Sequence, residues 1–360
     1  MSGETPVVKL LLKAGGTVGV QDVAGEKPQP AATLASAIQR SVPSLQGADA
    51  GFTAKSGCIS CHNNSLAAMA VGLARKNGYR VDERIAAQQV KVNAAYIEHQ
   101  RDALHQSFFP GQAGSEAFGD VFGPSVLAYV MVGLAAEHYQ PDLDTDAAAM
   151  YLKSRQQLNG EWAYPEADTR QPVCLDYIGQ TALSMRALQL YAPKTGRAEY
   201  DKAVQLAASW LAKATPKTDE DRIWRLLGLA WAGRDKDATG KALRELAGAQ
   251  RPDGGWAQMA SLGSDAYATG RVLVALQAAG MPVSDPVYRR GVQFLLNSRM
   301  EDGSWHVRTR ALAFQPYFET GFPHGVDQSI SAAGTSWATM ALTLASAKSG
   351  GKTGTAAPPE

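Results

Sequence analysis

The sequence predicts an all-α protein, an (α/α)6 toroid in which six outer helices surround six inner ones. Three observations lead to this fold. Good helix formers with apolar residues at helical spacing continue through residues 31–347. Two kinds of helix, one amphipathic and one apolar nearly all round, alternate along that span. A turn that ends in tryptophan recurs at Trp162, Trp256 and Trp305, so that one helix pair takes about 48 residues.

The two kinds of helix differ in where their charges lie. Helices with charges on one face are expected outside, at 31–45, 82–104, 145–157, 198–214, 237–250 and 285–299. Helices that are apolar nearly all round are expected inside, at 65–78, 124–139, 177–191, 220–233, 265–280 and 329–347. Strict alternation of the two kinds is what a toroid requires.

The ends of the chain are expected to lie outside this domain. Residues 1–30 contain VVKLLLKAGG, which resembles part of an ankyrin repeat. A single repeat cannot bury its apolar face, so we expect a remnant of a longer repeat array or a flexible arm. No basic segment or cleavage site marks a secretory signal there. Residues 348–360 are expected to form a disordered tail.

Composition excludes several classes of protein. The 360 residues are 45% hydrophobic and 19% charged, which is typical of a globular protein. A net charge of +1 offers no basic surface for nucleic acid. No apolar run approaches the ~20 residues of a membrane span. Three cysteines are too few for a disulfide scaffold.

The tryptophan turns identify a family resemblance. The segments YLKSRQQLNGEW, LAGAQRPDGGW and FLLNSRMEDGSW resemble the Gln-Trp (QW) motifs of squalene-hopene cyclases and related toroids, which include protein prenyltransferase β subunits. The resemblance covers roughly residues 140–347. It implies the fold far more than an activity, because one fold hosts many functions.

The segment SGCISCHNNS, residues 56–65, contains the most informative motif. Its Cys-x-x-Cys-His pattern resembles the haem-attachment motif of c-type cytochromes. The resemblance implies haem c, with Cys58 and Cys61 as thioether residues and His62 as an iron ligand. Zinc is an alternative, although no second cysteine pair supplies a fourth ligand. A thioredoxin-like redox pair is a third, although no βαβ pattern surrounds it.

Ring closure suggests where a second iron ligand would come from. The first inner helix has the second and the sixth as neighbours, and long loops at 105–123 and 306–329 precede those two. Both loops are rich in aromatic residues and carry histidine. We predict His324 as the second ligand and His105 as the next candidate; five-coordinate iron is the alternative.

Two arginines of the second loop, Arg308 and Arg310, are predicted to pair with haem propionates, or else to be ordinary surface charges. The haem reading predicts electron transfer or redox sensing with an unidentified redox partner. Because haem c is attached outside the cytoplasm, it also predicts a periplasmic or extracellular protein.

An enzyme remains the alternative function. A terpenoid-cyclase-like enzyme would protonate an apolar isoprenoid substrate in the central cavity, with Asp176, Asp265 or Asp327 as the acid. These residues open inner helices, so helix capping is the more ordinary explanation for them. The family's Asp-x-Asp-Asp motif is only approached by PDLDTDAA, which has Thr145 in place of an aspartate. A module that binds a lipid-like ligand without chemistry is the third possibility.

Overall fold

The computed structural model describes residues 13–14, 27–31, 33–106, 115–163, 176–310 and 317–347, apart from the side chains of residues 62, 106 and 115–123. Within these ranges every regular element is a helix, and no strand occurs. No helix in the described ranges is long and apolar enough to cross a membrane. Most of the ankyrin-like segment and the whole tail from residue 348 lie outside the described residues.

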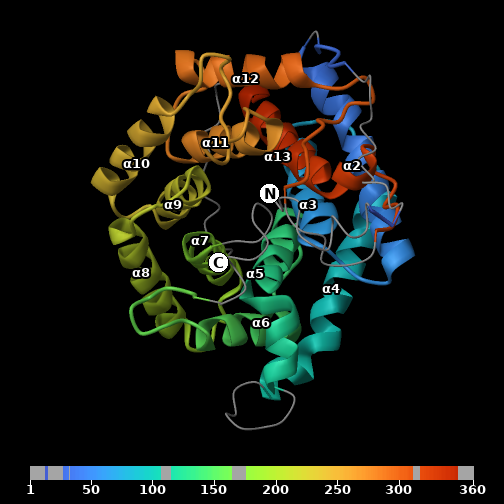
Figure 1. Ribbon diagram of the computed structural model, residues 1–360. Helices are drawn as coiled ribbons and strands as arrows, with labels where there is room; N and C mark the ends of the chain where they lie inside the picture. The colour runs from blue at the N-terminus through green and yellow to red at the C-terminus, as the bar shows by residue number, and fades with distance from the viewer. Residues whose placement is uncertain are drawn as a thin grey trace.

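In the described ranges, twelve α-helices alternate between an outer and an inner ring (Figure 1). The outer helices are α2 (Leu34–Ser56), α4 (Glu83–Gln106), α6 (Leu143–Ser154), α8 (Arg197–Lys213), α10 (Lys236–Gly248) and α12 (Pro286–Ser298). The inner helices are α3 (Leu66–Lys76), α5 (Ser115–Ala136), α7 (Tyr177–Tyr191), α9 (Asp219–Ala232), α11 (Ala266–Ala278) and α13 (Gln328–Ser346). The predicted (α/α)6 toroid is therefore confirmed.

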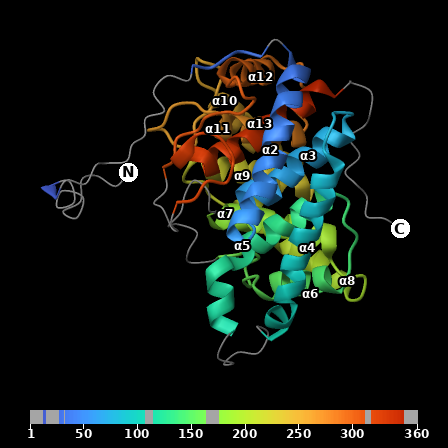
Figure 2. The ribbon, with the colours of Figure 1, turned by 90° about the vertical axis from the view of Figure 1, so that its right-hand side faces the viewer.

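The inner ring is closed. Each inner helix contacts the next one, and α13 contacts α3. Each outer helix packs on the inner helices at either side, so that α2 covers the seam between α13 and α3. Figure 2 shows α2 and α4 on the near side, with α3 beside them. All six inner helices begin at the same end of the ring, which we call the mouth.

Two helices are longer than the sequence predicted. Helix α2 continues to Ser56 rather than ending near residue 45, and α5 begins at Ser115 rather than at 124. Each contains a proline, Pro43 or Pro124, within the helix. Proline removes one backbone donor, and a helix whose other bonds and contacts persist can continue through it.

The three tryptophan turns, which we call the Trp turns (residues 155–162, 249–256 and 298–305), share one construction. In the second, the Trp256 indole N–H donates to the Leu246 carbonyl at 2.9 Å, and its backbone N–H donates to Thr269 Oγ1, also at 2.9 Å. One residue thus joins an outer helix to the next inner one. The same two bonds join Trp162 to Leu152 and Thr181, and Trp305 to Leu295 and Thr335.

Each Trp turn also contains a glycine with positive φ, at Gly160, Gly254 or Gly303. A Cβ atom on Gly254 would lie 2.8 Å from the Arg290 carbonyl oxygen of α12, so only glycine allows this approach. Gly303 meets α2 in the same way, through the Arg40 carbonyl. The last Trp turn therefore fastens the final helix pair to the first.

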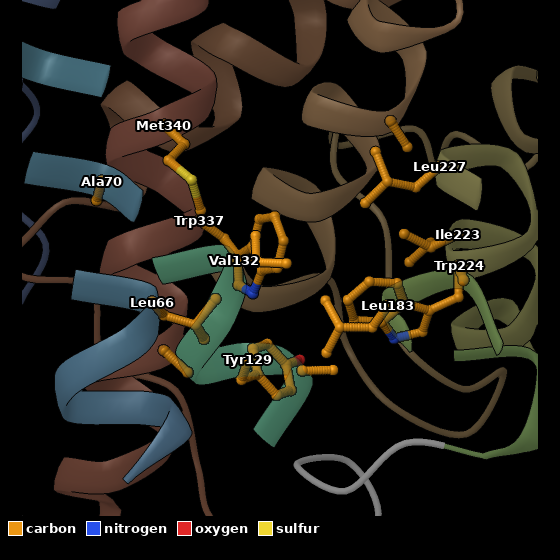
Figure 3. Close-up of a cluster of buried hydrophobic side chains, with 14 of the residues drawn as sticks. Leu66, Ala70, Tyr129, Val132, Leu183, Ile223, Trp224, Leu227, Trp337 and Met340 are labelled. Carbon is orange, nitrogen blue, oxygen red and sulfur yellow. The ribbon is translucent and has the colours of Figure 1, made fainter. Parts of the chain in front are cut away.

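Large side chains fill the middle of the ring (Figure 3). Trp224 and Trp337 are each 1% exposed, and their ring centroids lie 6.3 Å apart. The guanidinium of Arg271 lies over Trp224 and is ion-paired with Glu220, and both charged side chains are buried. At this depth side chains take up the space, so an apolar ligand of the kind we expected would have to bind nearer the mouth.

Candidate functional site

The Cys-x-x-Cys-His motif lies in a specialised turn at the mouth, which we call the CxxCH turn (residues 57–65). Helix α2 ends at Gly57, whose φ of 64° reverses the chain. After an extended Ser60, a π-helix runs from Cys61 to Ser65 and leads into α3. This π-helix contacts α2, α3, α4, α5 and α13. Single π-turns within helices are frequent at functional sites.

The two thiols face different neighbours. Cys58 and Cys61 are both partly exposed, and neither forms a disulfide with a described residue. Burial raises the pKa of Tyr96 on α4, and a charge on Cys58 adds to this effect. Burial likewise raises the pKa of Tyr129 on α5, to which Cys61 contributes. Cys58 therefore lies near Tyr96 of α4, and Cys61 lies near Tyr129 of α5.

A buried amide holds this turn in place. Asn64 Oδ1 accepts the Ser60 backbone N–H at 2.7 Å. Asn64 Nδ2 donates to Thr53 Oγ1 at 3.1 Å and to the Asp49 carboxyl, both on α2. The Ser60 hydroxyl in turn accepts the Asn63 backbone N–H at 3.0 Å. Sequence reasoning missed Asn64, although its place within CHNNS was visible.

The described part of the loop before α13 lies against α2, the helix that leads into the CxxCH turn. The Thr320 carbonyl approaches Gly51 of α2 so closely that a Cβ there would meet it. Phe318 packs on Phe52 with ring centroids 5.4 Å apart. Gln328 at the start of α13 accepts the Thr320 N–H at 2.8 Å and donates to the Phe318 carbonyl. Aromatic groups therefore flank the α2 side of the motif.

His324 is buried at the mouth in a left-handed conformation, with φ of 82°. Its Nε2 lies 2.6 Å from Ser304 Oγ, and its ring stacks on His306 at 4.6 Å. Since Ser304 Oγ donates to Asp302, His324 Nε2 carries the proton of this bond. Burial lowers the pKa of His324 to about 4, so the imidazole is neutral near pH 7. A neutral imidazole suits a metal ligand.

The other predicted iron ligands are less fully described. His105 is exposed in the last turn of α4. The side chain of His62 lies outside the described residues, as do residues 107–114 and 311–316 of the two aromatic loops. Among the side chains that are described, no three histidine, cysteine or acidic residues are grouped as a metal site would require.

The two arginines predicted to hold propionates differ. Arg308 is exposed. Arg310 is ion-paired with Asp265 and donates to Gln258 Oε1 at 3.0 Å. These existing partners mean that Arg310 would have to exchange contacts to meet a propionate.

The three candidate acids are not equivalent. Asp265 caps α11 and pairs with Arg310. Asp327 is ion-paired with His306 at 2.7 Å, and although burial opposes it, hydrogen bonds from His306 and Thr309 lower its pKa. Asp176 caps α7, and burial together with a hydrogen bond to Asp221 raises its pKa to about 8. Asp176 therefore holds a proton near neutral pH.

Asp221, in the first turn of α9, explains the behaviour of Asp176. Its carboxylate accepts the N–H groups of Lys217 and Thr218, at 2.7 and 3.0 Å, and the Thr218 hydroxyl. These donors stabilise the charged form of Asp221, so the shared proton stays on Asp176. The capping box TDED, residues 218–221, fixes this carboxylate at the start of α9.

Comparisons with known proteins agree with this fold. Residues 216–355 match the family model of the squalene-hopene cyclase C-terminal domain. A crystal structure of a protein from Actinoplanes is 14% identical, with a TM-score of 0.55, and covers 87% of this chain and 99% of its own. The unsaturated glucuronyl hydrolase responsible for glycosaminoglycan degradation in Bacillus sp. GL1 is 14% identical, with a TM-score of 0.55. It covers 85% of this chain and 96% of its own. No curated protein matches the sequence.

Proposed function

We propose that the protein carries haem c at the mouth of the toroid and acts in electron transfer or redox sensing. The observation that carries this proposal is the CxxCH turn itself. It supplies two accessible thiols, Cys58 and Cys61, followed directly by His62, at the start of the first inner helix. When bound, haem c supplies one-electron chemistry at iron.

The residues around the turn fit such a group. Cys58 and Cys61 would hold the two former vinyl carbons, and His62 would bind the iron. Phe52 and Phe318 offer an apolar flank, and the buried Ile59 adds to it. His324 has the neutral ring that a second iron ligand needs, but its bond to Ser304 would have to be exchanged. A protein with haem c would mature in the periplasm or outside the cell and exchange electrons with a partner protein.

The test is production together with haem maturation machinery, followed by denaturing electrophoresis stained for haem. Haem that stays on the chain after denaturation supports the proposal. Cys58→Ser and Cys61→Ser should each weaken the stain, and the double variant should abolish it. Wild-type protein without covalent haem under these conditions would refute it.

A second candidate function follows from Asp176. A carboxyl group whose pKa is raised to about 8 is a proton donor at pH 7, as an enzyme acting on an apolar isoprenoid substrate would need. Glycoside hydrolysis, which the name of the Bacillus neighbour suggests, fits less well. Asp176 and Asp221 are hydrogen-bonded to each other, whereas the carboxyls of glycosidases stand about 5 Å or more apart to flank a sugar bond. Asp176→Asn would abolish activity on such a substrate and leave haem staining unchanged.

A further inference from the structure

His324, which the sequence predicts as the second iron ligand, is held at one edge and at one face of its ring. At the edge, its Nε2 lies 2.6 Å from Ser304 Oγ of the last Trp turn. At the face, the ring stacks on His306, with centroids 4.6 Å apart and planes at 13°. His306 is itself fixed by Asp327, whose carboxylate lies 2.7 Å from its Nε2. To turn toward another group, His324 would have to break the bond to Ser304 and leave the stack on His306.

The backbone of His324 is fixed as well. Among the non-glycine residues of the described ranges, only His138 and His324 have a positive φ, which is 82° for His324. Residues with a Cβ atom adopt this conformation rarely. The His324 carbonyl also accepts the Asp327 N–H at 2.9 Å. Rare backbone conformations that the surrounding structure maintains are found mostly at functional sites.

Ser304 decides which nitrogen of His324 carries the proton. The Ser304 hydroxyl donates to Asp302 Oδ1 at 2.6 Å, and the Ser304 backbone N–H donates to the same oxygen at 2.8 Å. Because a hydroxyl has one proton, toward His324 it can only accept. His324 Nε2 is therefore an N–H donor and has no lone pair for iron. The other nitrogen, Nδ1, lies next to Cβ, where the backbone of the residue crowds a large planar ligand.

The turn that holds this acceptor is itself immobilised. Ser304 is fully buried between Gly303 and Trp305. The Trp305 indole N–H donates to the Leu295 carbonyl at 2.8 Å, and a Cβ atom on Gly303 would meet the Arg40 carbonyl of α2. The serine is thus fastened to an outer helix on each side. If the histidine is to bind iron, the histidine alone has to move.

We propose that Ser304 is a positioning residue that keeps His324 off the iron, an inference that rests on the proposed function. Haem c then has His62 as its one side-chain ligand, and the second axial position stays open to water or to a small ligand such as carbon monoxide. Of the two coordination states that the sequence leaves open, this one suits a sensor, whose iron must bind a ligand. An electron carrier keeps the same ligands throughout. The proposed function then narrows to sensing.

The main test variant is Ser304→Ala, which removes the acceptor and little volume. Ser331→Ala is the matched control, because Ser331 is also fully buried and its hydroxyl accepts the Val307 N–H at 3.0 Å and donates to the Val307 carbonyl. Any general effect of losing a buried hydroxyl beside this loop appears there as well. His324→Asn removes the imidazole, and asparagine tolerates the left-handed backbone. It is made alone and together with Ser304→Ala.

The first measurement is electron paramagnetic resonance of the ferric protein, purified from cells with haem maturation machinery. We expect high-spin iron in the wild type and in Ser331→Ala, mostly low-spin iron in Ser304→Ala, and high-spin iron again in the double variant. Carbon monoxide should bind the reduced Ser304→Ala protein about tenfold more slowly than the wild type, since His324 must first leave the iron. Ser331→Ala should bind carbon monoxide as the wild type does.

Three results would overturn the inference and leave the proposed function standing. Low-spin wild-type iron that becomes high-spin in His324→Asn would show that the histidine is already bound. Low-spin wild-type iron that His324→Asn leaves unchanged would show another ligand in the open position. High-spin iron in both the wild type and Ser304→Ala would show that Ser304 restrains nothing. If the wild type carries no covalent haem, the proposed function fails, and this inference fails with it.

Nuclear magnetic resonance of the haem-free protein, with nitrogen-labelled histidine, examines the bond to Ser304 without haem. The nitrogen shifts of His324 should report a proton on Nε2 in the wild type. That proton should exchange with water about tenfold faster in Ser304→Ala, since one buried hydrogen bond is lost, and at the wild-type rate in Ser331→Ala. A wild-type His324 that carries its proton on Nδ1, or equal exchange in all three proteins, would contradict the role given to Ser304.

Discussion

The Trp turns and the CxxCH turn solve the same structural problem in different ways. Both lead from an outer helix to the start of an inner one. A Trp turn fills its interior with a buried indole. In Trp256 the indole N–H donates to Leu246 of the outer helix, and the backbone N–H donates to Thr269 of the inner helix. The CxxCH turn has no indole, and Asn64 holds it through polar bonds instead. The buried indole of a Trp turn leaves no reactive group accessible, whereas the hydrogen bonds of Asn64 leave the two thiols of the CxxCH turn partly exposed.

The difference indicates where function was added to the repeat. The Trp turns recur with the same bonds and a glycine in the same place, as a structural unit would. The CxxCH turn lies at the same end of the ring but has no buried indole. We infer that a functional advantage offsets the loss of packing. The cofactor attachment that we propose at this position would provide one, next to an outer helix and the loop before α13.

Removing the indole of a Trp turn should have the largest effect on the stability of the protein. Trp256→Ala leaves a cavity and removes the indole donor of the Leu246 carbonyl, so we expect a loss of about 4 kcal/mol in the free energy of unfolding. The control is Trp231→Ala, at the partly exposed end of α9, which should cost less than half as much. Denaturant unfolding followed by circular dichroism measures both. Equal losses of unfolding free energy in the two variants would show that the indole of a Trp turn stabilises the protein no more than a partly exposed tryptophan does.

Replacing the glycine of a Trp turn with alanine should have the second largest effect on stability. Gly254→Ala would strain a φ of 86° and place a Cβ 2.8 Å from the Arg290 carbonyl, so we expect a loss of about 2 kcal/mol. Gly280→Ala has a similar φ but open space, and separates the strain from the clash. Gly263→Ala, with neither feature, should be neutral. If Gly280→Ala costs as much as Gly254→Ala, the close approach of α12 contributes nothing.

The inner-helix caps that follow the Trp turns should respond differently to pH. The pKa of Asp176 is raised to about 8 in the folded protein, from 3.8. The folded state therefore keeps a proton that the unfolded chain releases, and its contribution to stability is lost as pH rises through 8. Asp176→Asn lacks this penalty and should exceed the wild type by about 2 kcal/mol at pH 9 but not at pH 4.

Asp265→Asn is the control for this pH effect. Asp265 caps α11 in the same way but meets Arg310 instead of a second carboxyl, so its replacement should destabilise the protein at pH 9. The lowered pKa of Asp221 affects stability only in acid. Between pH 4 and 8 the expected change in stability therefore comes from Asp176. Parallel stability curves for wild type and Asp176→Asn across that window would contradict the shared proton.

The smallest effect is expected from the glutamine of a Trp turn. Gln250 Nε2 donates to the carbonyls of Gly254 and Val287, at 2.9 and 2.8 Å, so Gln250→Ala should cost about 1 kcal/mol. Gln293→Ala, whose side chain bonds only to Asn297 of its own helix, should be within 0.5 kcal/mol of wild type, roughly as surface changes are. Thermal unfolding of the two variants side by side resolves the difference.

Sequence patterns predicted the ring because it is built from repeated local signals. Helical periodicity and the spacing of Trp162, Trp256 and Trp305 were sufficient for the order of helices and for closure. The boundaries predicted near residues 45 and 124 were wrong, because α2 continues to Ser56 and α5 begins at Ser115. Asn64 was missed because its importance depends on partners that only the fold brings close. The haem ligands stay predictions.

The absorption spectrum of the purified protein, produced with haem maturation machinery, tests most directly whether the CxxCH turn binds haem c. We predict a Soret band, and α and β bands on reduction, that stay with the chain after acid-acetone extraction and disappear in the Cys58→Ser/Cys61→Ser double variant. A colourless wild-type protein, or colour that extraction removes completely, would contradict covalent haem. Metal analysis for zinc and assays of Asp176 as an acid would then take priority.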